Sequence, residues 1–225
     1  MSNQQFDLSI LDPTIIYPIM GSSYGDKDFG DLNLDKDHLR TLNIVTEEDH
    51  RVYHDKIRAQ SKCIWLIGGY MERRDLYKSD LFMSDKTSIR EIHLGVDIWG
   101  AQGSPIFAPL DGEIHSFAYN ALPLDYGYTL ILKHRYESLD FYTLYGHLGR
   151  KYFDSWQEGD PIKAGDPIGT LGDKSENGGW LPHLHLQVIY DMHGKKGDYP
   201  GVCSLADQNY YRKNCPGPSS LIVKS

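Results

Sequence analysis

Short strand-like segments separated by turn residues fill the middle of the chain, and they constrain its fold more than any other feature. Aliphatic, β-branched and aromatic runs alternate there with turns rich in glycine, aspartate and asparagine. The candidate strands cover residues 105–108, 112–119, 128–134, 141–145, 167–171 and 183–190. Spacing of this kind is typical of a compact antiparallel β-domain. The sequence therefore predicts a mainly β fold in which an antiparallel sheet or sandwich forms a groove.

The N-terminal part of the chain has a different character and predicts a short α-containing extension. Thr46 is followed by three acidic residues, as at the start of many helices, so we expect one helix over residues 46–61. Residues 64–67 are apolar enough for a buried strand, whereas residues 1–45 predict irregular structure. The predicted organisation is an extension of residues 1–88 packed on the core, a β-domain of residues 89–195, and a C-terminal tail of residues 196–225.

Charge and hydropathy exclude some partners. The formal net charge is -8 and no long basic run is present, which argues against a nucleic-acid partner. No stretch reaches the roughly 18 apolar residues of a membrane span, and the N-terminus lacks the basic and apolar regions of a signal peptide. We therefore expect no membrane span and a cytoplasmic location, with an extracytoplasmic one only by another export route. The sequence predicts no particular oligomeric state.

The three cysteines, Cys63, Cys203 and Cys215, form no CxxC pair. An odd number without such a pair favours reduced thiols, with a Cys203–Cys215 disulfide as the alternative.

Two histidine motifs have the spacing of a metal site. His183 and His185 are two residues apart, so on a strand both rings point to one face. His93 and Asp97 are four apart, which places them on one face of a strand or on one helical turn. Imidazole and carboxylate groups are usual zinc ligands, and three protein ligands with an open position form the catalytic zinc pattern. His147 lies between the two motifs in a Tyr-Gly-His sequence.

The other histidines have no such context. We expect ordinary surface or core roles for five of them and leave His134, at the end of a predicted strand, open. The five are His38, His50, His54, His115 and His193.

Six motifs occur in an order that is similar to a known family. They are His93-Leu-Gly95-Val-Asp97, Gly103-Ser-Pro105 through Gly112, Tyr126-Gly127 with a strand ending at His134, Tyr145-Gly-His147-Leu148, a glycine-rich series from Gly159 to Gly169, and Pro182-His183-Leu184-His185. In this order they resemble the M23 family of zinc metallopeptidases, the lysostaphin-like or LytM-like endopeptidases. The resemblance covers nearly half of the chain and implies a β fold of the duplicated hybrid motif type.

The resemblance implies a role for each motif residue. His93, Asp97 and His185 would be the ligands of one zinc ion per chain, and His147 and His183 would be catalytic histidines without a bond to the metal. A fourth ligand from a preceding segment, such as Asn33 or Asn43, is an open alternative. The implied function is zinc-dependent hydrolysis of peptide bonds, in peptidoglycan-type or glycine-rich peptides.

The loop before the last motif departs from the family pattern. It is longer and carries Trp180, so we expect Tyr145, Asn177 and Trp180 to line the substrate groove. The stretch from Trp65 to Arg74 resembles a less common branch, in which similar domains are joined to aminotransferase-like and kinase-like domains. A zinc-bearing binding or scaffolding module without turnover is the main alternative. A sugar-transport-type phosphocarrier, which also pairs two histidines on a related fold, is a third.

Overall fold

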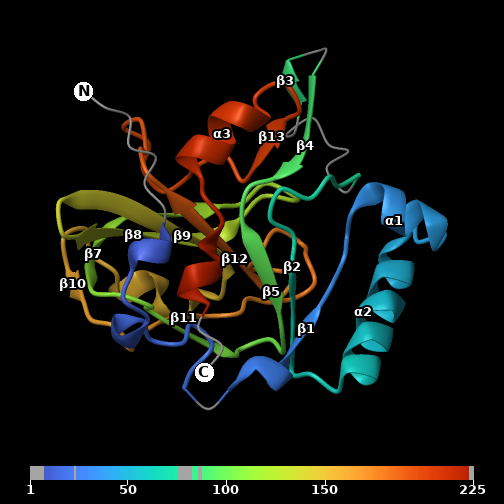
Figure 1. The fold of residues 1–225 in the computed structure, drawn as a ribbon, viewed down its shortest axis with the longest axis horizontal. Coiled ribbons are helices and arrows are strands. Elements are labelled where there is room, and N and C mark those ends of the chain that lie inside the picture. The colour runs from blue at the N-terminus through green and yellow to red at the C-terminus, as the bar shows by residue number, and fades with distance from the viewer. Residues whose placement is uncertain (1–7, 23, 76–82, 86–87, 223–225) are drawn as a thin grey trace.

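A large mixed sheet is the centre of the computed structural model, which describes residues 8–22, 24–75, 83–85 and 88–222 (Figure 1). Within these residues the sheet has eight strands, and every neighbouring pair is antiparallel except β1 and β2. In sheet order they are β1 (Phe29–Asp31), β2 (Trp65–Gly68), β5 (Val96–Trp99), β12 (His183–Ile189), β9 (Leu139–Leu148), β8 (Gly127–Tyr136), β7 (Gly112–Asn120) and β10 (Pro161–Ile162). The predicted mainly β fold is confirmed.

Two smaller sheets flank the large one. Strand β6 (Pro105–Phe107) pairs with β11 (Pro167–Thr170), and β4 (Ser88–His93) lies between β3 (Met83–Asp85) and β13 (Val202–Ser204). Only Leu94 and Gly95 separate β4 from β5, so the chain passes from one sheet to the next within two residues. This short connection fixes the position of His93 relative to the large sheet.

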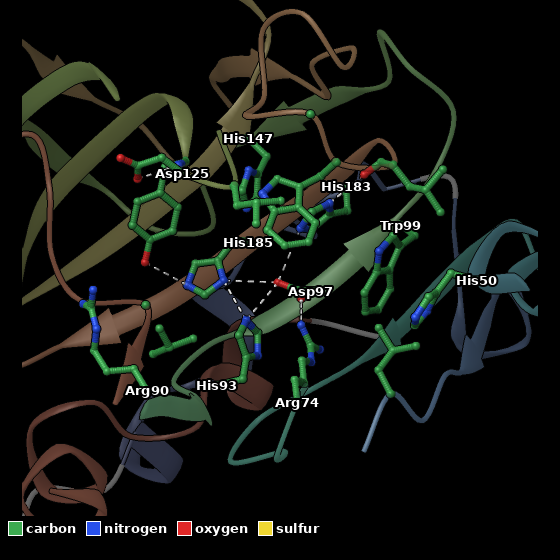
Figure 2. Close-up of a pocket in the computed structure, with 18 of the residues that line it drawn as sticks. His50, Arg74, Arg90, His93, Asp97, Trp99, Asp125, His147, His183 and His185 are labelled. Carbon is green, nitrogen blue, oxygen red and sulfur yellow. Dashed lines mark hydrogen bonds and ion pairs between the residues drawn. The ribbon is translucent and has the colours of Figure 1, made fainter. Parts of the chain in front are cut away.

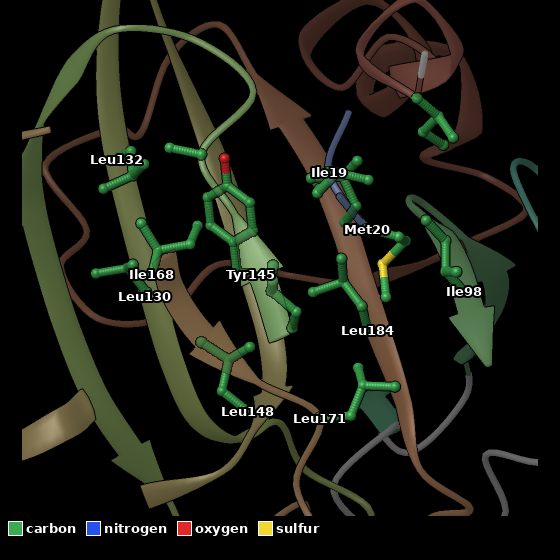
Figure 3. Packing of buried hydrophobic residues seen from close by; sticks show 14 of the residues in the cluster. Ile19, Met20, Ile98, Leu130, Leu132, Tyr145, Leu148, Ile168, Leu171 and Leu184 are labelled. Atoms are coloured by element: carbon green, nitrogen blue, oxygen red, sulfur yellow. The ribbon is translucent and has the colours of Figure 1, made fainter. Parts of the chain in front are cut away.

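The alternation of side chains gives the large sheet two distinct faces. Leu184 and Leu186 on β12 belong to the main apolar core, and Leu186 is the register partner of Tyr145 on β9. Figure 3 shows Leu184 and Tyr145 among the packed core side chains. Because neighbours along a strand point to opposite faces, His183 and His185 project from the other face. The predicted strand position of the His-Leu-His motif is confirmed.

The N-terminal segment is more ordered than the sequence suggested. Helix α2 (Glu47–Ser61) agrees with the prediction, and Thr46 and Asp49 form a reciprocal capping box at its start. Residues 1–45 were expected to be irregular, yet they contain β1 and helix α1 (Lys36–Thr41). Strand β1 is three residues long and forms because β2 offers a free edge beside it, which no local pattern encodes. Helices α1 and α2 lie beside this end of the sheet (Figure 1).

The C-terminal segment contributes to the core instead of ending as a simple tail. It contains β13, helix α3 (Gln208–Asn214) and the 3-10 helix η6 (Pro218–Leu221). Leu221 and Cys215 are fully buried, and Cys63, Cys203 and Cys215 are free thiols. The other 3-10 helices are η1 (Leu8–Ile10), η2 (Pro13–Ile15), η3 (Asp26–Asp28) and η5 (Arg150–Ser155).

Parts of both predicted terminal segments fall outside the described residues: 1–7, 23, 76–82, 86–87 and 223–225. Among the described residues, none of the helices is long and apolar enough to cross a membrane.

Candidate metal centre and its pocket

Three strands bring the candidate metal ligands together. His93 ends β4, Asp97 lies on β5, and His185 lies on β12 as the register partner of Asp97. The prediction that His93 and Asp97 share one strand or helical turn is wrong, because the chain changes sheets between them. Gly95 lets the His185 ring approach closely, since a Cβ atom there would lie 2.6 Å from Cε1 of His185.

The three ligand atoms form a small triangle. Nε2 of His93 lies 2.9 Å from Nδ1 of His185, and Oδ1 of Asp97 lies 3.3 Å from the first and 3.1 Å from the second. Figure 2 shows the two rings and the carboxylate converging on one point. In a tetrahedral zinc site with bonds of roughly 2.0–2.1 Å, the ligand atoms are about 3.3–3.4 Å apart. The triangle therefore has nearly the dimensions that a zinc ion requires.

The hydrogen bonds of the two imidazoles leave lone pairs at the centre of this triangle. Nδ1 of His93 donates to the carbonyl of Gly69 at 2.9 Å, so Nε2 of the neutral ring is an acceptor. Nε2 of His185 donates to Oε1 of Gln187 at 3.0 Å. The amide of Gln187 is oriented by its own Nε2, which donates to the Pro200 carbonyl at 3.1 Å. Nδ1 of His185 is therefore also an acceptor.

Charge and burial support the same protonation states. Burial lowers the pKa of His93 to about 4, so its ring is neutral near pH 7. Burial alone would raise the pKa of Asp97, but attraction to His93, which is protonated only in the acid range, and to the Arg74 guanidinium outweighs it and holds that pKa well below its usual value. Three acceptors without a proton between them thus converge at one buried point. Such a set of acceptors fits a divalent cation.

A β-bulge brings His147 to the same face. Leu130 pairs with Tyr145 and Tyr128 with Leu148, so Gly146 and His147 of β9 oppose the single residue Thr129. His147 adopts a left-handed backbone conformation with φ of 64°. The extra residue reverses the alternation of side chains after Tyr145. His147 consequently projects to the metal side, although it is two residues from a core tyrosine.

His147 and His183 lie together beside the triangle. Their ring centroids are 4.2 Å apart, and Nε2 of His183 lies 3.9 Å from Oδ1 of Asp97. Each ring donates from Nδ1 to a carbonyl, His147 to Asn177 at 2.9 Å and His183 to Leu181 at 2.7 Å. Burial lowers the pKa of both rings. Both therefore present an unprotonated Nε2 near neutral pH, as a proton acceptor requires.

The site opens into a pocket of 510 Å³. Its lining includes Trp99, Trp180, Leu181, Arg90 and Asp125. Figure 2 shows Trp99 on the opposite side of the site from Arg90 and Asp125. Trp180, which the sequence predicted for the substrate groove, lines this pocket. The pocket is large enough for several residues of an extended peptide or for a comparable ligand.

Two predicted groove residues do not line the pocket. Tyr145 is fully buried in the core on the opposite face of the sheet, because the bulge separates it from His147. Asn177 is also fully buried, and its side chain organises the loop by bonding to the Gly172 and Trp180 carbonyls. Its contribution to the site comes from its backbone carbonyl, which orients His147.

Helix α2 supplies pocket residues that sequence reasoning missed. His50 and His54 were expected to be ordinary, yet both line the pocket. His54 is buried and packs edge-on with Trp99, with ring centroids 5.3 Å apart. Trp99 in turn stacks on His183, with ring centroids 5.6 Å apart. Their spacing of four residues places the two histidines on one face of the helix, but only the packing of α2 shows that this face meets the site.

The sequence also predicted no role at the site for Arg74 or Gln187. Gln187 is two residues beyond His185 on β12, so strand alternation could have indicated it. Arg74 donates from Nη1 to Oδ2 of Asp97 at 2.6 Å, and no local pattern links these residues. Neither Asn33 nor Asn43 lines the pocket; the Asn33 side chain instead accepts from the backbone N–H of Asp35.

Comparisons with known proteins agree with the geometry. Residues 91–198 match the model of peptidase family M23. Lipoprotein NlpD of Yersinia enterocolitica is 33% identical over 94 residues, which are 42% of this chain and 86% of that protein. Peptidoglycan DD-endopeptidase ShyC of Vibrio cholerae is 34% identical over 97 residues, 43% of this chain and 20% of the relative. The chain belongs to peptidase family M23, a family of metallopeptidases.

One further relative is matched over a small part of its length, and one solved structure over most of it. An uncharacterized metalloprotease of Haemophilus influenzae is 34% identical over 95 residues, which are 42% of this chain and 18% of that protein. Among solved structures, the catalytic domain of lysostaphin from Staphylococcus simulans aligns with a TM-score of 0.38 and 22% identity. That alignment covers 54% of this chain and 80% of the lysostaphin domain.

Proposed function

We propose that the chain is a zinc-dependent endopeptidase that hydrolyses peptide bonds in peptidoglycan-type or glycine-rich peptides. One observation carries the proposal: acceptor atoms of His93, Asp97 and His185 converge within 2.9–3.3 Å while the outer atoms of both rings are already hydrogen-bonded. A buried arrangement of this kind is costly unless a cation occupies its centre.

The metal would supply the electrophilic part of the chemistry. His93, Asp97 and His185 would hold a zinc ion which, when bound, would polarise a substrate carbonyl and lower the pKa of a water molecule beside it. His147 and His183 then act on protons. Each has an unprotonated Nε2 on the pocket side and a ring orientation fixed by a carbonyl at Nδ1. One ring can take a proton from the attacking water, and a protonated ring can return it to the leaving amine.

The pocket and the relatives support a peptide substrate. Trp99 and Trp180 offer apolar surface in the pocket, and Arg90 and Asp125 offer charged groups. A peptide with both apolar and charged groups would find complementary surface here. The relative ShyC is named a peptidoglycan endopeptidase, which makes cross-linked wall peptides the first substrates to test.

Metal analysis followed by a cleavage assay tests the proposal. We expect one zinc per purified chain and time-dependent cleavage of either a pentaglycine peptide or a D-alanyl cross-linked muropeptide, read by mass spectrometry. Asp97→Asn is the matched control, since it keeps the side-chain shape but removes the charged ligand. Zinc without cleavage of any peptide in a broad library would indicate a non-catalytic binding module. A protein that binds no zinc would refute the proposal.

A further inference from the structure

We propose that Arg74 is a positioning residue of the metal centre, which holds Oδ2 of Asp97 so that Oδ1 alone faces the metal. The inference rests on the proposed function, because it assigns a role toward the metal that His93, Asp97 and His185 would bind. It concerns a residue outside the family match, which begins at residue 91. None of the six motifs from His93 to His185 includes it.

The guanidinium of Arg74 is fixed on two sides in the protein interior. Nη1 donates to Oδ2 of Asp97 at 2.6 Å, and Nε donates to Oε2 of Glu72 at 2.8 Å. The side chains of Arg74 and Asp97 are only 3% and 2% exposed. Glu72 is held in turn, because its Oε1 accepts from the backbone N–H of Leu34 at 2.7 Å. Arg74 is thus the middle member of a rigid chain of charged groups.

This series of charged groups gives the two carboxylate oxygens of Asp97 different partners. Oδ2 is engaged by Arg74, whereas Oδ1 points at Nε2 of His93 and Nδ1 of His185. Charge-assisted hydrogen bonds of this length are roughly twice as strong as neutral ones. Rotation of the carboxylate, or binding of the metal through both oxygens, would break the bond to Arg74. The geometry thus favours a single metal bond and leaves coordination positions open for water and substrate.

The backbone of the segment that carries Arg74 places this residue beside Asp97 and His93. Gly68 of β2 is the register partner of Asp97 on β5, and the chain then turns back beside β4. The backbone N–H of Arg74 donates to the Glu91 carbonyl at 2.8 Å, which anchors the residue next to His93. A Cβ atom at Gly69 would lie 2.1 Å from Nη2 of Arg74, so only glycine admits the guanidinium. The N-terminal segment thereby supplies part of the metal centre.

Zinc affinity and the spectrum of the cobalt-substituted protein test this role without reference to catalysis. For Arg74→Met, we expect zinc binding about 10–100-fold weaker in competition with a chromophoric chelator, the usual loss for a group that orients a ligand. We also expect weaker visible absorption of Co²⁺, because Asp97 then binds through both oxygens and raises the coordination number. Arg74→Lys should recover part of the affinity, since an ammonium can still donate to Oδ2.

Arg73→Met is the matched control. Arg73 lies in the same segment, but its guanidinium pairs with Glu91 instead of Asp97. Its variant should bind zinc and cobalt as the wild type does. If Arg74→Met does not fold, Arg74→Gln provides the same readouts with a smaller loss of packing.

The role is wrong if folded Arg74→Met or Arg74→Gln shows wild-type zinc affinity and a wild-type cobalt spectrum. That outcome would leave the proposed function intact as long as the wild type binds zinc. A wild type without zinc affinity would instead overturn the proposed function itself.

Discussion

Two buried polar clusters that contain histidine lie on opposite faces of the large sheet and differ in how their polar atoms are paired. On one face, His93 and His185 direct acceptor atoms toward Asp97. On the other face, Nδ1 of His134 donates to the Asp111 carbonyl at 2.8 Å, and its Nε2 lies 2.7 Å from the Thr143 hydroxyl. The Thr143 hydroxyl lies in turn 2.9 Å from that of Tyr145. Each polar atom of this second cluster can be paired within the protein.

The difference separates a structural histidine from a candidate metal ligand. Burial lowers the pKa of His134 and of His93 to about 4, so both rings are neutral and equally inaccessible to bulk water. What distinguishes them is the partner of the second ring nitrogen. For His134 it is a hydroxyl group that can donate, and for His93 it is a second acceptor that cannot. The balance of donors and acceptors, more than burial or pKa, therefore identifies the metal centre.

The largest expected difference between the two clusters is in zinc content and hydrolysis after removal of one histidine from each. We expect His185→Ala to lose zinc and hydrolysis together, with activity at background, because two remaining ligands cannot hold the ion. His134→Gln should retain both, since its cluster faces the other side of the sheet. Metal content by mass spectrometry of the purified variants, with circular dichroism as a folding check, measures this. Equal zinc content in the two variants would contradict the assignment of the centre.

The two histidines beside the centre should separate metal binding from turnover. His147→Ala and His183→Ala should each keep one zinc per chain and lose ~10²–10⁴-fold in kcat, the usual contribution of a positioned acid or base. Single-turnover kinetics on the cleaved peptide, together with a zinc titration, provides the measurement. Wild-type turnover by His147→Ala would remove that residue from the proposed chemistry.

Added zinc should stabilise the protein through one cluster only. At a free concentration of about 1,000 times Kd, zinc should add about 4 kcal/mol to the free energy of unfolding. Asp97→Asn should lose most of this effect, and His134→Gln should show it in full. Chemical denaturation with and without zinc measures the difference. An equal zinc response in wild type and Asp97→Asn would show that the ion binds elsewhere.

The smallest predicted effect is a pH dependence of stability that belongs to His134. Its pKa falls from 6.5 to about 4 on folding because of burial, so below pH 6.5 the unfolded chain binds more protons than the folded protein. Stability should therefore decrease as the pH falls through this window, by about 2 kcal/mol for this group at pH 5. His134→Gln should be less sensitive by that amount in urea denaturation of the metal-free protein. Identical pH profiles for the two proteins would show that His134 does not titrate in this way.

Local sequence determined the elements whose signals are contained in a few neighbouring residues. Thr46 and Asp49 fix the start of α2 through bonds across one helical turn. His183 and His185 share a face because strand alternation needs only the spacing of two residues. The order of short motifs also identified the family, since each motif is local and their sequence along the chain is directly readable.

The tertiary structure decided what depends on contacts between distant segments. The change of sheets between His93 and Asp97, the bulge that directs His147 away from the face of Tyr145, and the approach of Arg74 to Asp97 have no counterpart in local spacing. A one-residue bulge reverses the faces of a strand, and it forms because of the pairing with β8. The sequence by itself therefore determined which residues can serve as ligands and acids or bases. Only the packing of the N-terminal segment and the register of the sheet decided which partners surround them, because these depend on pairings between residues far apart in the chain.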